Sequence, residues 1–189
     1  MDTRTLFGAL LIAGIIGGFS VNSYFMDNGT EDNIIDVEVG SEAPDFALTD
    51  SEGNSFNLSD FENEKVVVLE FMNMGCGSCH NFEKEVLKSY CNSTTMPEDV
   101  EVISLTQTED VSQEDLEDRA DGKNWAYVFG SEEITDAFGA DRSPSIVIID
   151  KDGIVTFSES GHMTESELEE RINEALALVS GSRTIPLKI

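Results

Sequence analysis

Basic residues are scarce in this chain. It has 11 lysines and arginines against 38 aspartates and glutamates in 189 residues, so its formal net charge at pH 7 is -27. A surface of this sign repels nucleic acid and anionic lipid, and we expect neither as a partner. The acids are scattered along the chain, which favours adaptation to salty surroundings over recruitment of a basic partner. Hydrophobic residues still make up 40% of the chain, so a folded core is expected.

Cysteine is also rare. Cys76 and Cys79 stand in C-x-x-C spacing, and Cys91 is left over. A closed structural zinc site usually needs two such ligand pairs, so zinc is disfavoured. A copper site made by these three cysteines and His80 is an alternative, although Cys79 and His80 would point in different directions on a helix. Cys91 is expected to be buried and inert, with a bridge between chains as the alternative.

A single long uncharged stretch stands at the N-terminus, where no charged residue appears between Arg4 and Asp27. About 20 uncharged residues can span a bilayer. No A-x-A cleavage site follows and no cysteine is placed to receive a lipid, so residues 1–26 predict an uncleaved transmembrane signal anchor. Cleavage after Ser23 is the alternative. Arg4 on one side and acids on the other favour a single-pass protein of the cell membrane whose domain faces outside the cytoplasm.

The rest of the chain divides into a polar tether (27–39), one folded domain (40–180) and a tail (181–189). A hairpin is expected over residues 46–58. Residue patterns predict strands at 66–72, 100–106, 126–129, 145–150 and 154–159, and helices after Cys76 and at 112–121, 131–138 and 164–179. Strands that alternate with helices and end in a hairpin and a helix indicate an α/β domain with a mixed central sheet. The sequence contains no internal repeat and no low-complexity tract.

The most informative segment is the apolar run at 66–72 together with the cysteines that follow it. The first cysteine of a C-x-x-C at a helix N-terminus feels the positive end of the helix dipole, which stabilises its thiolate and lowers its pKa. The second cysteine lies one turn on and can close a disulfide. With a strand before it and a helix after it, Cys76-Gly-Ser-Cys79 predicts a thioredoxin-like redox site.

Three separated blocks resemble the thioredoxin superfamily, in particular its TlpA-like and redoxin (AhpC/TSA-type) branch. Residues 40–53 are similar to the N-terminal signature of that branch, residues 70–79 to its active-site block, and residues 142–153 to its cis-proline loop with the following strand and hairpin. The resemblance covers about residues 40–179. It implies a thioredoxin fold with a mixed central sheet flanked by helices.

The resemblance also implies roles for three side chains in the active-site block. Cys76 would attack a disulfide and form a mixed disulfide, and Cys79 would resolve it. Glu70 lies six residues before Cys76 and matches the buried acid of thioredoxins, which can exchange a proton with Cys79 because burial raises its pKa. The alternative for Glu70 is a carboxylate exposed to water at a strand edge.

Further roles follow for the residues around the cysteines. Pro144 would be a cis-proline that faces them, and the backbone of Ser143 would pair with an extended substrate segment. Gly77 and Ser78, between the cysteines, are expected to contact the substrate and to tune the redox potential. The family's usual tryptophan before the first cysteine and proline before the second are both missing. Trp125, far away in the sequence, is expected to be a core residue rather than a substitute.

We therefore expect a membrane-tethered thiol–disulfide oxidoreductase that acts on exported protein thiols or disulfides, with neither a metal nor a dissociable cofactor. The resemblance to TlpA-like proteins implies a membrane-embedded thiol carrier as the source of electrons. Other readings stay open, and one is that the two cysteines form a fixed structural disulfide. The segment Cys76-Gly-Ser-Cys79-His80 also fits covalent haem c attachment, with His162 or a methionine as distal ligand. A domain that holds haem or copper at these cysteines would be an electron-transfer module. The block at 40–53 taken alone would also fit a peroxiredoxin-like antioxidant.

Overall fold

The computed structural model describes residues 37–108 and 110–178. The predicted anchor (1–26), most of the tether and the tail (181–189) lie outside the described residues, and these three assignments stay predictions. Within the described ranges, no helix is both long enough and apolar enough to cross a membrane.

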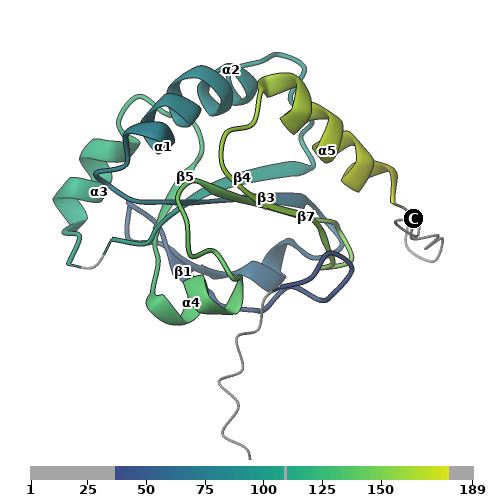
Figure 1. The fold of residues 1–189 in the computed structure, drawn as a ribbon, viewed down its shortest axis with the longest axis horizontal. Helices are drawn as coiled ribbons and strands as arrows, with labels where there is room; N and C mark the ends of the chain where they lie inside the picture. The colour runs from purple at the N-terminus through teal and green to yellow at the C-terminus, as the bar shows by residue number, and fades with distance from the viewer. Residues whose placement is uncertain (1–36, 109, 179–189) are drawn as a thin grey trace, which may run out of the picture. The chain divides into compact units, whose positions relative to one another are not determined.

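A five-stranded sheet with the order β5-β4-β3-β6-β7 forms the centre of the fold (Figure 1). All seven residues of β3 are buried, as expected for a strand that is covered on both faces. β4 pairs parallel with β3, and β5 parallel with β4. β6 pairs antiparallel with β3, and β7 antiparallel with β6, so the sheet is mixed as predicted. The strands are β3 (Val66–Met72), β4 (Val100–Thr106), β5 (Ala126–Phe129), β6 (Ser145–Ile149) and β7 (Val155–Ser160).

The helices and a small hairpin cover the two faces of this sheet. The hairpin consists of β1 (Ala47–Thr49) and β2 (Ser55–Asn57) and runs into a 3-10 turn, η1 (Leu58–Phe61). The helical segments are α1 (Gly77–Phe82), the π-helical turn η2 (Glu83–Leu87), α2 (Lys88–Cys91), α3 (Gln113–Ala120), α4 (Glu132–Ala137) and α5 (Glu165–Ala177). In Figure 1, α1, α2, α3 and α5 lie on one side of the sheet, with α4 and the hairpin on the other.

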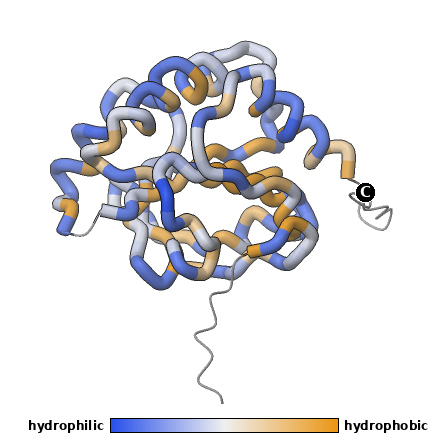
Figure 2. The backbone as a smooth tube through the Cα atoms, in the orientation of Figure 1, coloured by the Kyte–Doolittle hydropathy of each residue, from blue (hydrophilic) through white to orange (hydrophobic). Residues whose placement is uncertain are grey.

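The alternation of side chains along β3 divides the hydrophobic core in two. The even-numbered residues Val66, Val68 and Met72 pack with side chains from α1, α2, α3 and α5. The odd-numbered residues pack with α4 and the hairpin. Figure 2 shows the hydrophobic residues gathered in the central strands and hydrophilic ones along the outer helices. Because successive side chains of a strand point to opposite faces, Glu70 lies on the side covered by α1, α2 and α5.

The element boundaries agree closely with those expected from the sequence. Ser112, Ser131 and Thr164 are the N-caps of α3, α4 and α5, and each side chain accepts a hydrogen bond from the third residue of its helix. The helix after the cysteines departs from expectation, because it contains the π-helical turn η2 in its middle. One face of this helix is nevertheless apolar and packs into the core, since Cys79, Phe82, Val86, Leu87 and Tyr90 are all buried.

Candidate active site

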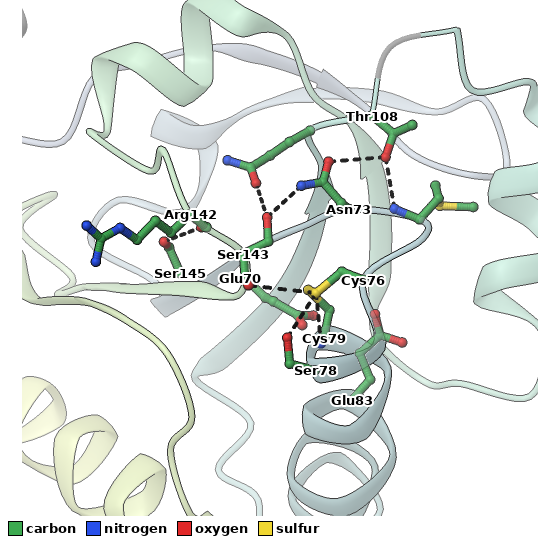
Figure 3. The surroundings of a disulfide bond; sticks show 12 residues. Glu70, Asn73, Cys76, Ser78, Cys79, Glu83, Thr108, Arg142, Ser143 and Ser145 are labelled. Atoms are coloured by element: carbon green, nitrogen blue, oxygen red, sulfur yellow. Dashed lines mark hydrogen bonds between the residues drawn. A yellow bond between two sulfur atoms is a disulfide. The ribbon is translucent and has the colours of Figure 1, made fainter.

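Cys76 and Cys79 form a disulfide at the start of α1, with their Cα atoms 5.3 Å apart (Figure 3). Cys76 is the N-cap of the helix, and its sulfur accepts a hydrogen bond from the backbone N–H of Cys79 at 3.0 Å. Cys76 is half-buried, whereas Cys79 is fully buried. The Cys76 sulfur is therefore the one open to an incoming thiol or disulfide.

The loop before β6 lies against the Cys76 sulfur. The Ser143–Pro144 peptide bond is cis, as the resemblance implied. The carbonyl oxygen of Ser143 is 3.7 Å from Cys76 Sγ, close enough to accept a hydrogen bond from the reduced thiol. Gly77 and Ser78 are exposed beside it, and the Ser78 hydroxyl oxygen lies 3.2 Å from the same sulfur. The structure thus brings the predicted substrate-binding residues to one side of Cys76.

A chain of polar side chains that the sequence analysis missed holds this loop in place. Asn73 Nδ2 donates to the Ser143 hydroxyl at 2.8 Å, and that hydroxyl donates to the side-chain oxygen of Gln107. The Gln107 amide donates in turn to the carbonyl of Ala140. Thr108 donates to Asn73 Oδ1 at 3.3 Å, as Figure 3 shows. Asn73, Gln107 and Thr108 directly follow β3 and β4. Polar residues at the carboxyl ends of neighbouring parallel strands were the signal that could have revealed them.

Glu70 is completely buried beneath the disulfide, which excludes the exposed-edge alternative. Its Oε2 accepts a hydrogen bond from the Ser104 hydroxyl at 2.5 Å, and its Oε1 has no hydrogen-bond partner in the part of the chain that the structure describes. Figure 3 shows its side chain extending from β3 towards Cys79. Burial, reinforced by the negative charge of Glu83, raises the pKa of Glu70 to about 8. This carboxyl can therefore hold or release a proton near neutral pH.

Glu83 is a second buried acid, and the sequence analysis did not single it out. It is 1% exposed, and its Oε1 lies 2.8 Å from Arg119 Nη2. Its Oε2 lies 3.4 Å from Lys123 Nζ. Residues i and i+4 of a helix share a face, so the position of Glu83 four residues after Cys79 was the available signal. The partners, 36 and 40 residues further along the chain, could not be read from that spacing.

The structure also places the residues of the copper and haem readings. Cys91 is buried and free, and burial raises the pKa of its thiol to about 12, so the expectation of a buried side chain is confirmed. His162 packs edge-to-face on Phe82, with ring centroids 6.4 Å apart. Across the described ranges, no three His, Cys, Asp or Glu side chains gather in a group that could hold a metal ion. Trp125 is in the core as expected.

Comparison with known proteins identifies the family to which this chain belongs. The family model described as Redoxin matches residues 38–176. The chain belongs to the redoxin family. The thiol-disulfide oxidoreductase ResA of Bacillus cereus (strain ATCC 10987 / NRS 248) is 31% identical to this redoxin over 169 residues, which are 87% of this chain and 91% of the relative. ResA of Geobacillus kaustophilus (strain HTA426) is 29% identical over 174 residues, which are 89% of this chain and 92% of the relative.

Solved structures agree with the fold. A putative thiol:disulfide interchange protein DsbE from Chlorobium tepidum has a TM-score of 0.62 at 23% identity, over 75% of this redoxin and 99% of that chain. A putative thioredoxin from Neisseria meningitidis has a TM-score of 0.64 at 21% identity, over 75% of this redoxin and 95% of that chain. Both show the thioredoxin-like fold. Together with the curated relatives and the Cys76–Cys79 disulfide, the findings identify this redoxin as a thiol–disulfide oxidoreductase.

Proposed function

We propose that this redoxin carries out dithiol–disulfide exchange between its Cys76–Cys79 pair and the disulfides of exported proteins. It would act outside the cytoplasm, held there by a membrane anchor. One observation carries the proposal: the half-buried Cys76 lies beside the cis-proline loop, with the buried Cys79 behind it and the buried acid Glu70 below. A nucleophile, a resolving thiol and a proton acceptor are what dithiol–disulfide exchange requires.

The exchange has two steps. The Cys76 thiolate attacks one sulfur of the substrate disulfide, so a mixed disulfide forms and the other substrate sulfur leaves as a thiolate. The Cys79 thiol then gives its proton to the Glu70 carboxylate and attacks the Cys76 sulfur, which closes the Cys76–Cys79 disulfide and releases the second substrate thiolate. Two electrons pass from the enzyme dithiol to the substrate, whose two thiolates take protons from water.

Glu70 also serves the reverse step, in which the enzyme disulfide is reduced. With a pKa of about 8 in the disulfide form, Glu70 holds a proton at neutral pH. When an incoming thiolate attacks Cys76, the buried Cys79 leaves as a thiolate, and a proton from Glu70 neutralises it where water cannot readily do so. Catalysis needs no dissociable cofactor in either direction.

The substrate segment would lie along the cis-proline loop. The backbone of Ser143 stands next to Cys76, with its carbonyl oxygen 3.7 Å from the sulfur, and Ser78 and Gly77 are exposed on the adjoining turn. An extended peptide that pairs with the Ser143 backbone would present its disulfide to Cys76. Pro144 would shape this surface.

The supply of electrons and the place of action rest on the sequence. Residues 1–26 are predicted to anchor the protein, and a membrane-embedded thiol carrier would reduce the enzyme disulfide. The similarity to ResA proteins over most of the chain supports the thiol–disulfide exchange that such a carrier would supply with electrons.

A redox titration of the full-length protein in detergent tests the proposal, with alkylation at Cys76 and Cys79 as the readout. A reversible two-electron couple near the ~-270 mV of thioredoxin supports a reductase, whereas one near ~-120 mV indicates an oxidant of exported thiols. Cys91 is an internal control, because a buried thiol with a pKa of about 12 stays unmodified in the folded protein. If Cys76 and Cys79 do not cycle, the proposal is wrong.

A further inference from the structure

We propose that Glu83, held between Arg119 and Lys123, is a positioning residue that controls the proton on Glu70. The inference deepens the proposed function and rests on the role given there to Glu70. It starts from an asymmetry between two buried acids that face the same side of the sheet.

The first half of the asymmetry is that two cations meet Glu83 directly, although within the described residues its Oε2 makes an ion pair without a hydrogen bond. Its Oε1 accepts hydrogen bonds from Arg119 Nη2 at 2.8 Å and from Arg119 Nε at 3.3 Å. Its Oε2 lies 3.4 Å from Lys123 Nζ. The two cationic side chains are themselves only 13% and 16% exposed. A buried carboxylate is costly unless cations meet it directly, and Arg119 and Lys123 compensate the charge of Glu83 in this way.

The second half is that, among the described residues, no cation lies at hydrogen-bond distance from Glu70. Its one hydrogen-bond partner there is the neutral hydroxyl of Ser104, and Oε1 has none. Two neighbouring buried carboxylates are not readily ionised together, so the acid with the weaker compensation keeps the proton. That acid is Glu70, the one beneath the cysteines. Its raised pKa agrees, since burial is the first cause and the charge of Glu83 the second.

Charged and titratable groups from every neighbouring element can affect whether Glu70 is protonated. Arg119 at the end of α3 and Lys123 in the turn after it favour ionised Glu70. Tyr127 of β5 stays neutral, because burial and both acids raise its pKa. Cys91 of α2 is neutral as well, with a pKa of about 12. Among these described groups, Glu83 supplies the negative charge. Cys79 of α1 is bound in the disulfide.

It follows that α3 and the turn after it act on the active site from a distance. Lys123 also packs over the rings of Trp125 and Tyr127, at 5.9 Å and 4.7 Å from their centroids, and its Nζ donates to the carbonyl oxygen of Arg119. A change to either cation would alter the proton affinity of Glu70 without touching the cysteines.

Carboxyl carbon NMR with ¹³C-labelled glutamate tests the inference on the full-length disulfide form in detergent, between pH 4 and pH 10. In Glu83→Gln the two cations lose their buried counter-ion and act on Glu70, so we expect its pKa to fall by about 1 or more. In Lys123→Gln one of these cations is removed while the Arg119–Glu83 pair remains, so the pKa of Glu70 should rise by ~0.5. Glu85→Gln is the matched control, because Glu85 is exposed on the same helical segment.

The opposite directions separate charge coupling from a loosened structure. A variant that lets water reach Glu70 lowers its pKa towards the ordinary value, whichever residue is changed. A rise in Lys123→Gln with a fall in Glu83→Gln therefore supports the inference, and a fall or no change in Lys123→Gln overturns it. An unchanged Glu70 pKa in Glu83→Gln overturns it too. The titration uses neither substrate nor thiol cycling, so it decides this point even if the redox titration of Cys76 and Cys79 fails.

Discussion

Ser104 donates a hydrogen bond from its hydroxyl to Oε2 of Glu70 at 2.5 Å, across the two parallel strands β4 and β3, in which these residues are direct partners. Trp125 Nε1 donates to the same hydroxyl oxygen at 2.9 Å. An indole N–H can only donate, so it occupies a lone pair of Ser104 and directs the hydroxyl proton to Glu70. The single tryptophan of the chain thus orients the hydrogen bond to the acid beneath the cysteines.

Ser104→Ala removes the hydroxyl that links these two side chains. The Trp125 N–H then has no partner in the core, and leaving a buried donor unpaired costs about 1–3 kcal/mol. We expect the free energy of unfolding to fall by that amount in urea denaturation followed by tryptophan fluorescence. Ser55→Ala, which removes an exposed hydroxyl on β2, is the control and should change stability little. Equal stability of the two variants would contradict the prediction.

Glu70→Gln should change how stability depends on pH. The pKa of Glu70 is about 8 in the folded protein, against an ordinary value of 4.5. Its contribution to stability is complete below the unfolded pKa and is lost as pH rises towards the folded pKa, because the folded state retains a proton that the unfolded state has released. Relative to Glu70→Gln, the wild type should lose about 1.4 kcal/mol per pH unit between pH 5 and pH 8.

Urea denaturation of both proteins across this pH range provides the measurement. Glu98→Gln is the control, because Glu98 is exposed. A difference between the wild type and Glu70→Gln that stays constant from pH 5 to pH 8 would show that Glu70 does not titrate there.

The two cysteines should behave differently when each is replaced. Cys79→Ser leaves the accessible Cys76 able to attack a peptide disulfide but removes the thiol that resolves the product. The mixed disulfide should then accumulate, and mass spectrometry of the intact protein detects it. Cys76→Ser leaves the fully buried Cys79, so we expect no stable adduct at equal peptide concentration. Comparable adducts with both variants would argue against Cys76 as the nucleophile.

Ser143→Ala breaks the polar chain that holds the cis-proline loop. It leaves Asn73 Nδ2 and the side-chain oxygen of Gln107 without their shared partner. A small displacement of a positioned substrate can cost up to about 100-fold in rate, so we expect the rate constant for reaction with a disulfide peptide to fall about 10- to 100-fold. Stopped-flow kinetics measure it. Ser158→Ala on β7 should react as the wild type does, and an equal rate in Ser143→Ala would mean that the loop needs no such support.

Local patterns in the sequence were enough to predict much of this fold. Short residue patterns, such as the apolar run at 66–72, placed the strands and helices, because strand and helix periods act over a few residues. The same local logic placed Cys76 and Cys79 at a helix start. The spacing of Glu70 from Cys76 matched a family pattern that implied a buried acid. The structure decided against an exposed carboxylate, because β3 is covered on both faces.

The packing of distant segments decided the surroundings of the cysteines. Glu83 meets Arg119 and Lys123 because α3 and the turn after it pack against the π-helical turn, and no spacing within one helix encodes that contact. Likewise, Asn73 and Ser143 stand 70 residues apart and meet only when β3 and the loop before β6 are assembled. The sequence by itself determined which residues could carry the redox chemistry. The tertiary structure decided which charges and hydrogen bonds surround them, because those depend on contacts between elements that are distant along the chain.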